Sequence, residues 1–201
     1  MIMKSPTVPH PAEALVLAKI APAVIERANR IRIMAFDVDG VLTDGRLWYG
    51  EHGEAFKSFN VLDGHGLSLL RESGITIALI TGRQGPILAR RAAELGISIV
   101  LQGVRDKATA LVALAQQHGC TLEQVGFMGD DIIDLAAMQR AGLAISVPNA
   151  PIYVAQAAHW VTATAGGFGA VRECCDVILA AQGRLRTFFA SRPFTTSGPT
   201  Q

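Results

Sequence analysis

Short hydrophobic runs alternate along the chain with longer segments in which apolar residues recur every three or four positions. The runs at 31–36, 75–80 and 125–128 have the length and composition of strands buried on both faces. Segment 107–118 has the spacing of an amphipathic helix. The predicted strands are 31–36, 75–80, 97–101, 125–128, 143–147 and 160–161, and the predicted helices are 22–28, 63–73, 86–95, 107–118, 132–141, 152–157 and 170–182. This alternation predicts an α/β fold with a doubly wound parallel sheet and right-handed crossovers.

Segment 46–60 interrupts the alternation between the first strand and the helix that follows it. Its two halves flank a stretch that contains glycines, which predicts a small β-hairpin. The hairpin aromatics fit packing and an interface between subunits better than a platform for stacking substrate, and they are Trp48, Tyr49, Phe56 and Phe59.

The length of 201 residues suits one α/β domain. We assign this domain to residues 22–183, with the hairpin inside it. Residues 1–21 are expected to form a flexible or partly helical extension. The tail at 184–201 has no periodicity, and we expect it to be flexible.

Composition narrows the class of protein further. The net charge is +1 and there is no block of lysine or arginine, so no nucleic-acid partner is expected. No apolar run reaches the roughly 18 residues of a membrane span. Segment 12–28 carries several charges and Pro22, which does not fit a signal peptide. The three cysteines have no metal-ligand spacing and suggest reduced thiols, so we expect a cytoplasmic enzyme.

The most informative chemical feature directly follows the first predicted strand. Asp37 and Asp39 stand two residues apart, and Gly40 allows the backbone to bend so that both carboxylates face one centre. Two like charges this close favour a divalent cation as their partner. An aspartate can also attack phosphorus and form an aspartyl-phosphate. The alternative is an acidic turn without catalytic meaning.

Two further strand ends offer groups that bind phosphate. In an open parallel sheet the site lies beyond the carboxyl ends of the strands. Thr81, Gly82 and Arg83 follow one strand, where a hydroxyl and backbone N–H groups can hold a phosphoryl oxygen. Lys107 stands near the start of a helix, where an anionic neighbour would offset its unfavourable position in the helix dipole. Taken alone, the first could be a polar turn and the second a solvated surface charge.

A fourth strand end carries three carboxylates within five residues. Asp130 directly follows the strand at 125–128 and suits direct coordination of Mg²⁺. Asp37 and the backbone carbonyl of Asp39 would complete the protein ligands. Asp131 and Asp134 lie three residues apart on the next turn and suit a supporting role around those ligands.

These four motifs, in this order, resemble the haloacid dehalogenase superfamily of phosphohydrolases over residues 31–182. By that resemblance Asp37 is the nucleophile. Asp39 is the general acid that protonates the leaving alkoxide and then the base that activates water. Thr81 and Lys107 hold the phosphoryl oxygens, and Asp130 holds Mg²⁺.

A finer resemblance is to the phosphatases of 3-deoxy-D-manno-octulosonate 8-phosphate (KDO 8-phosphate), which act in lipopolysaccharide precursor synthesis. It rests on the hairpin and on the motifs at 37–45, 59–66, 80–83 and 166–173. The resemblance implies a capless homotetramer in which the hairpins assemble centrally. A neighbouring subunit helps to close each site, and the glycine-rich C-terminal segment lies near it.

Several alternatives stay open. Related proteins hydrolyse nine-carbon keto-acid phosphates, or are modules fused to cytidylyltransferases, for which this chain has no room. A capless site could take other phosphometabolites or phosphoprotein, and a catalytically silent assembly module is a further alternative that the intact set of acids opposes.

Four residues are candidates for binding the substrate. Arg83 could hold a sugar carboxylate or belong to a structural ion pair, and Arg172 has the same two readings. Asp63 could line the entrance or cap a helix. Gly82 is included for its place beside Thr81.

Overall fold

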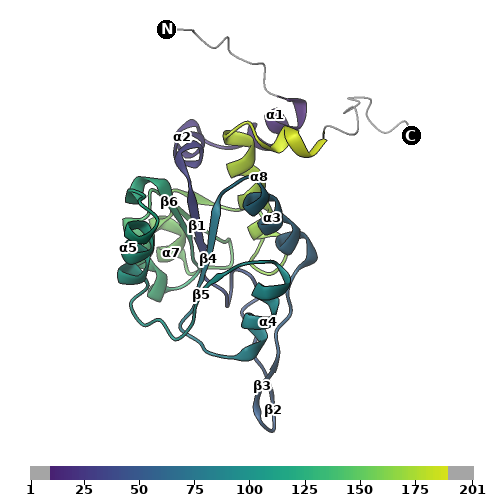
Figure 1. Ribbon diagram of the computed structural model, residues 1–201, viewed down its shortest axis with the longest axis vertical. Coiled ribbons are helices and arrows are strands. Elements are labelled where there is room, and N and C mark those ends of the chain that lie inside the picture. The colour runs from purple at the N-terminus through teal and green to yellow at the C-terminus, as the bar shows by residue number, and fades with distance from the viewer. Residues whose placement is uncertain (1–9, 190–201) are drawn as a thin grey trace, which may run out of the picture.

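Six strands form one parallel sheet at the centre of the computed structural model, which describes residues 10–189 (Figure 1). The predictions for residues 1–9 and 190–201 lie outside the described residues. The strands are β1 (Ile33–Phe36), β4 (Thr76–Ile80), β5 (Ile99–Leu101), β6 (Val125–Met128), β7 (Leu143–Ser146) and β8 (Trp160–Val161). Their spatial order is β5-β4-β1-β6-β7-β8, so β1 is central and the direction of winding reverses there. The predicted doubly wound sheet is confirmed.

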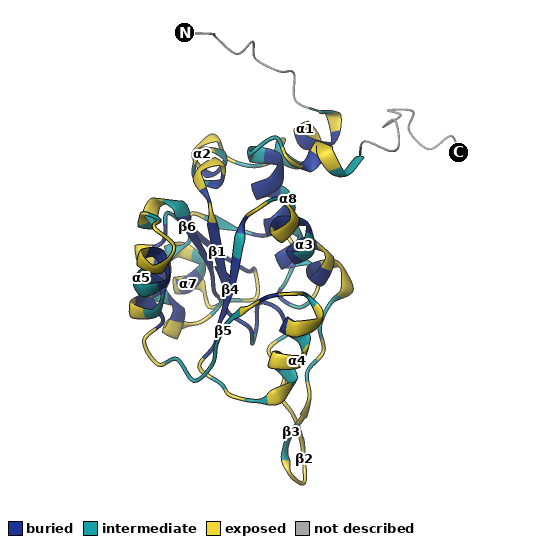
Figure 2. Cartoon of the chain, in the orientation of Figure 1, coloured by how far each residue is buried: buried dark blue, intermediate teal, exposed yellow. Residues whose placement is uncertain are grey.

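Helices cover both faces of the sheet and bury its side chains (Figure 2). Successive residues of a strand point to opposite faces. Accordingly, Met34 and Phe36 of β1 belong to one apolar cluster, and Ile33 and Ala35 belong to the other. The first face carries α2 (Pro22–Arg30), α3 (Val61–Glu72), α4 (Pro86–Glu94) and α8 (Ala170–Ala181). The second carries α5 (Lys107–Gln117), α6 (Leu135–Arg140) and α7 (Ile152–Ala157).

The predicted helix at 132–141 is in fact two pieces. Residues Ile132–Asp134 form the 3-10 turn η2, and α6 begins at Leu135. The reason is that the Asp134 side chain points back inward and accepts hydrogen bonds from the backbone N–H groups of Asp130 and Asp131. This tightens the first turn before the regular helix starts.

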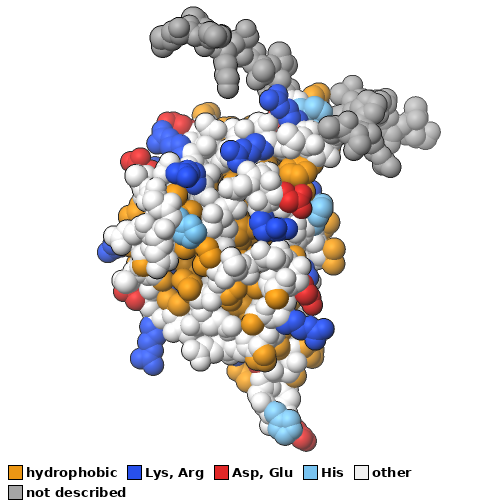
Figure 3. All heavy atoms as spheres, viewed as in Figure 1, with side chains coloured by type: hydrophobic (Ala, Val, Ile, Leu, Met, Phe, Trp, Pro, Cys, Tyr) orange, Lys and Arg blue, Asp and Glu red, His pale blue; other side chains and the backbone are white. Residues whose placement is uncertain are grey.

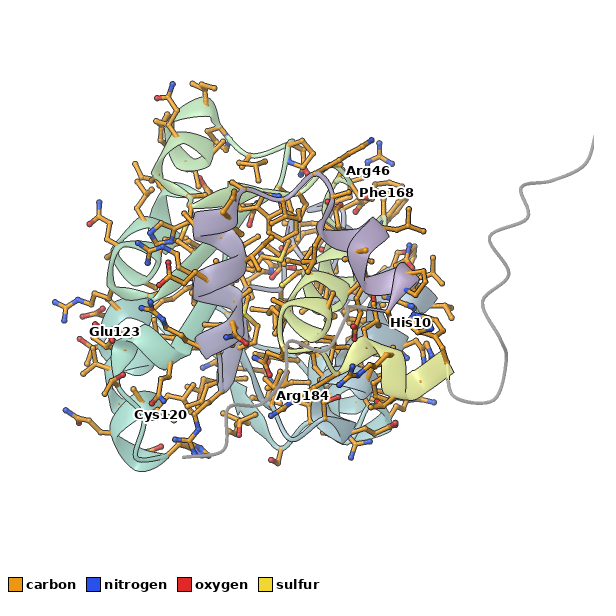
Figure 4. The ribbon with its side chains drawn as sticks, turned by 90° about the horizontal axis from the view of Figure 1, so that it is seen from above. His10, Arg46, Cys120, Glu123, Phe168 and Arg184 are labelled. Atoms are coloured by element: carbon orange, nitrogen blue, oxygen red, sulfur yellow. The ribbon has the colours of Figure 1, made fainter. Side chains whose placement is uncertain are left out.

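Parts of both predicted terminal segments are regular. Helix α1 (Pro11–Leu17) packs beside the 3-10 helix η3 (Leu185–Phe189), and the two lie together near His10 in the view from above (Figure 4). The buried carboxylate of Glu13 joins them, because it accepts a 2.9 Å hydrogen bond from the Arg186 N–H. Residues 185–189 therefore differ from the flexible tail expected there, because Leu185 is buried against the core.

The predicted hairpin is present as β2 (Trp48–Gly50) and β3 (Gly53–Phe56), which pair antiparallel. It projects from the body of the molecule, and a histidine and an acidic side chain lie at its tip (Figure 3). No cap domain occurs within residues 10–189. Among these residues, no helix has the length and apolar character needed to cross a membrane.

Candidate active site

The carboxyl end of β1 leads directly into the candidate site. The Asp37 N–H still donates to the carbonyl of Met128 in β6, so the carboxylate of Asp37 starts from the sheet itself. The chain then turns sharply at Gly40, which has φ +105°. A Cβ atom at Gly40 would lie 2.0 Å from Oδ2 of Asp130. Only glycine both adopts this backbone conformation and leaves space for that carboxylate.

Lys107 lies between two buried carboxylates. Its Nζ donates to Oδ1 of Asp37 at 2.5 Å and to Oδ1 of Asp134 at 2.6 Å, and its side chain is only 1% exposed. Burial by itself lowers the pKa of Lys107, but the two carboxylates outweigh that effect and raise it. Burial and the nearby charge of Asp134 raise the pKa of Asp37 to about 6, although the ammonium group opposes this shift.

The side chains of Asp37, Asp130 and Asp134 bring oxygen atoms within 4.8 Å of one another, the one such acidic group among the described residues. Burial and the charges of Asp37 and Asp134 raise the pKa of Asp130 to about 8. Its Oδ1 is buried and has no hydrogen-bond partner within residues 10–189. Both oxygens of Asp134 are already occupied, by Lys107 and by backbone N–H groups. The arrangement fits a hard divalent cation bound by Asp37 and Asp130, with Asp134 in support.

Asp39 is held from two sides. Its Oδ1 accepts a hydrogen bond from Nζ of Lys57, and its Oδ2 accepts a 3.4 Å hydrogen bond from the hydroxyl of Thr81. Lys57 follows β3, and its Nζ also lies 2.9 Å from Oε1 of Glu54. The hairpin therefore reaches the second carboxylate of the motif at 37–39, which the sequence reasoning did not anticipate.

Arg83 lies at the wall of a narrow pocket that also contains Asp39 and Thr81. Its Nη2 donates a 3.0 Å hydrogen bond to the hydroxyl of Tyr49 and lies 3.7 Å from Oε1 of Glu54. Its Nε is buried and has no partner among the described residues. The space inside this narrow pocket is about 10 Å³, roughly enough for one water molecule.

The structure brings together most of the predicted site residues but not all of them. Asp63 is buried and accepts a 2.7 Å hydrogen bond from the Arg172 N–H, so it stabilises the start of α8. The Nε of Arg172 pairs with Asp176 on the same helix. Neither Asp63 nor Arg172 lines the pocket that Arg83 borders. Asp131 is exposed and caps η2, and Gly82 is exposed beside Thr81.

Sequence reasoning missed three hairpin residues that contact the site, Tyr49, Glu54 and Lys57. The sequence carries no clear signal for this, because Glu54 and Lys57 have the character of ordinary solvated hairpin residues. Phe59 was grouped with the other hairpin aromatics as a residue for packing or a subunit interface. It is partly buried against the core of its own chain, with the Arg91 guanidinium over its ring, so it is not part of an exposed patch.

The chain is similar to known hydrolases. Residues 93–172 match the model of the haloacid dehalogenase-like hydrolases, a stretch that includes Lys107 and Asp130. The 3-deoxy-D-manno-octulosonate 8-phosphate phosphatase KdsC of Haemophilus influenzae is 45% identical over 172 residues, which cover 86% of this chain and 96% of the relative. The KdsC of Escherichia coli K12 is 42% identical and covers 83% of this chain and 88% of the relative.

Solved structures agree with this. A hypothetical protein from Xanthomonas campestris has a TM-score of 0.85 and 46% identity, covering 88% of this chain and 97% of that chain. The KDO 8-phosphate phosphatase of Moraxella catarrhalis, solved with magnesium, phosphate and KDO, has a TM-score of 0.81 and 45% identity. That match covers 84% of this chain and 97% of the other. The sequence, the fold and the acidic residues at the carboxyl ends of the strands all agree. This chain belongs to the KDO 8-phosphate phosphatase family of haloacid dehalogenase-like hydrolases.

Proposed function

We propose that this protein is a Mg²⁺-dependent phosphatase that releases KDO and inorganic phosphate from KDO 8-phosphate. The observation that carries the proposal is the environment of Asp37. Its carboxylate is buried at the end of β1, 2.5 Å from the ammonium of Lys107 and beside Oδ1 of Asp130, which has no hydrogen-bond partner among residues 10–189. The proposed nucleophile Asp37, the positive charge of Lys107 and the Oδ1 atom of Asp130 therefore lie next to one another.

The proposed reaction has two steps, transfer of the phosphoryl group to Asp37 and hydrolysis of the aspartyl-phosphate. In the first, a carboxylate oxygen of Asp37 bonds to phosphorus while the bond from phosphorus to the sugar oxygen breaks. Asp39 gives its proton to the departing alkoxide, and the donors of Thr81 and Lys107 stabilise charge on the phosphoryl oxygens. In the second, Asp39 takes a proton from water, the water oxygen bonds to phosphorus, and the aspartyl-phosphate breaks to free Asp37 and phosphate.

The metal that fits this donor set is Mg²⁺. We propose that Asp37, the backbone carbonyl of Asp39 and Asp130 hold it, with Asp134 fixing the loop that carries Asp130. When bound, the ion supplies charge neutralisation for the nucleophile and the phosphoryl group. The Moraxella relative, crystallised with magnesium, phosphate and KDO, supports this assignment.

We further propose a cytoplasmic homotetramer that acts in lipopolysaccharide precursor synthesis. The hairpin exposes three aromatic side chains, Trp48 by 43%, Tyr49 by 64% and Phe56 by 52%. A projecting hairpin with this surface is poorly stabilised alone, and association of several copies would cover it.

Arg83, at the pocket wall, is the candidate partner for the carboxylate of the sugar.

The test is a phosphate-release assay with Mg²⁺ on KDO 8-phosphate, a nine-carbon keto-acid phosphate, glucose 6-phosphate and p-nitrophenyl phosphate. KDO 8-phosphate should give the highest kcat/KM. The matched control is Asp37→Asn, which keeps the side-chain shape and cannot attack phosphorus, so activity should fall by at least about 10³-fold. A higher kcat/KM for the nine-carbon substrate would move the proposal to that substrate, and an active Asp37→Asn would remove Asp37 from its role.

A further inference from the structure

Lys57 is a buried cation that comes from the projecting hairpin and turns back toward the active site. Its side chain is only 6% exposed, although lysine is ordinarily a solvated surface residue. Taking an ammonium group out of water costs several kcal/mol unless charged partners compensate. Here the partners are the carboxylates of Asp39 and Glu54. These two carboxylates therefore offset the cost of withdrawing the ammonium group from water.

The contacts of Lys57 define the orientation of Asp39. The ammonium group holds Oδ1 of Asp39, and the Thr81 hydroxyl holds Oδ2 at 3.4 Å. With one oxygen held from each side, rotation of the carboxyl group would break at least one contact. Thr81 directly follows β4, whereas Lys57 directly follows the hairpin strand β3, so the carboxylate is fixed between two separate parts of the fold.

Glu54 in turn holds Lys57. Its Oε1 lies 2.9 Å from Nζ of Lys57 and 3.7 Å from Nη2 of Arg83, and its side chain is 13% exposed. One carboxylate thus links the lysine that contacts Asp39 with the arginine at the pocket wall. Because Glu54 and Lys57 are three residues apart, the same short stretch of hairpin supplies both groups.

We infer that Lys57 is a positioning residue for Asp39, held in place by Glu54, so that the hairpin completes the proton-transfer machinery of its own subunit. This inference rests on the proposed function, in which Asp39 is the acid that protonates the leaving group. Lys57 itself transfers no proton and forms no bond to the substrate. It keeps the Asp39 carboxyl group directed at the oxygen that leaves when Asp37 attacks phosphorus.

The leaving group distinguishes this role from a structural one. A sugar alkoxide is a strong base and leaves only if it receives a proton, so its departure depends on the placement of Asp39. p-Nitrophenolate is a weak base and leaves without a proton. The parameter kcat/KM reports steps up to release of the leaving group and excludes later hydrolysis of the aspartyl-phosphate, in which Asp39 acts for both substrates.

The experiment compares kcat/KM for KDO 8-phosphate and p-nitrophenyl phosphate in the full-length protein with Mg²⁺. In Lys57→Met, we expect kcat/KM to fall about 10- to 100-fold for the sugar phosphate and to stay within about threefold for the aryl phosphate. Lys57→Arg keeps the charge and should recover part of the loss. Arg46→Met is the matched control, because Arg46 is a 75% exposed cation at the start of the same hairpin segment and does not contact Asp39.

Equal losses on the two substrates would overturn the inference and assign Lys57 to folding, assembly or phosphate binding. No loss on either would overturn it as well. If Lys57→Met does not fold, Glu54→Gln leaves the lysine in place and loosens it, and a selective loss on the sugar phosphate remains the expected result. If wild type does not hydrolyse KDO 8-phosphate, the proposed substrate fails. The comparison can then use the best alkyl phosphate from the substrate assay.

Discussion

The ammonium group of Lys107 and the carboxylate of Asp37 form a buried pair at 2.5 Å, although the two residues are 70 positions apart in the chain. Lys107 is the first residue of α5, where the helix dipole disfavours a cation. Asp37 and Asp134 compensate for this by placing two carboxylates at that end of the helix.

Replacing Lys107 by methionine should therefore affect both stability and activity. The two carboxylates would be left buried without their cation, which costs about 3–5 kcal/mol of unfolding free energy in the metal-free protein. Loss of a charged donor to the phosphoryl group should lower kcat by about 10²- to 10³-fold. Denaturant unfolding and phosphate release measure the two effects. Lys19→Met, at an exposed lysine, is the control and should change neither.

Activity should depend on a divalent cation, because the proposed metal ligands Asp37 and Asp130 are acidic residues of the site. Exhaustive treatment with EDTA should abolish activity and Mg²⁺ should restore it. Ca²⁺ should restore little, because it accepts more ligands and a looser geometry than Mg²⁺. Full activity after chelation would rule out the proposed role of Asp37 and Asp130 as ligands.

Mg²⁺ should also raise the melting temperature more at pH 8 than at pH 5. Burial raises the pKa of Asp37 to about 6 and that of Asp130 to about 8, from a usual value of 3.8. The folded metal-free protein therefore holds protons that the unfolded chain has lost, and its stability declines as pH rises from about 4 toward 8. At pH 5 Mg²⁺ must displace these protons, whereas at pH 8 it meets charged carboxylates. Thermal unfolding with and without Mg²⁺ measures this, and in Asp130→Asn the difference between the two pH values should shrink.

Arg83 should govern selectivity for an acid sugar. A guanidinium can hold a carboxylate by two parallel hydrogen bonds, and lysine keeps the charge but loses this geometry. Arg83→Lys should lower kcat/KM for KDO 8-phosphate by about one to two decades, which corresponds to roughly 1.5–3 kcal/mol. The value for glucose 6-phosphate should change less. Arg90→Lys, on a side chain that is 86% exposed on α4, is the matched control.

Two results would contradict this account of Arg83. If wild type treats the two sugar phosphates alike, selectivity for an acid sugar is absent and a general phosphatase is the better description. If the preference is present but survives in Arg83→Lys, the carboxylate partner is another residue. Arg172 is the next candidate, and its pairing with Asp176 would have to open.

The exposed face of the hairpin should hold the tetramer together. The rings of Trp48 and Phe56 stack with centroids 5.0 Å apart and are both about half exposed. Changing both to serine should shift the protein from tetramer to smaller species in light scattering at micromolar concentration, with unchanged far-UV circular dichroism. Tyr153→Ser, at an aromatic side chain on α7 that is 51% exposed, should leave the assembly intact. A monomeric wild type would show that the hairpin acts within one chain only.

The amino-acid sequence alone was enough for the main architecture. Local hydrophobic patterns identify strands and helices because burial on a sheet and on a helix requires different spacings, and their alternation implies a parallel sheet. Once the sheet is parallel, its carboxyl ends must meet at one edge. For that reason Asp37, Asp39, Thr81 and Asp130 were predictable as one cluster, and the family resemblance added Lys107. In the structure, hydrogen bonds join Thr81 to Asp39 and Lys107 to Asp37, and Asp130 lies beside Asp37.

Only the tertiary structure decided which nearby polar residues join that cluster. Lys57 and Glu54 belong to a hairpin whose direction depends on how it packs against the domain, and no local spacing determines that direction. Asp63 and Arg172 have the right chemistry, but Asp63 accepts a hydrogen bond from the Arg172 N–H in α8, and the Arg172 guanidinium pairs with Asp176 on its own helix, so neither side chain reaches the pocket. The local hydrophobic pattern determines a helix or strand and its position in the sheet. The orientation of a single charged side chain is set by long-range packing and by the charged groups that this packing places beside it.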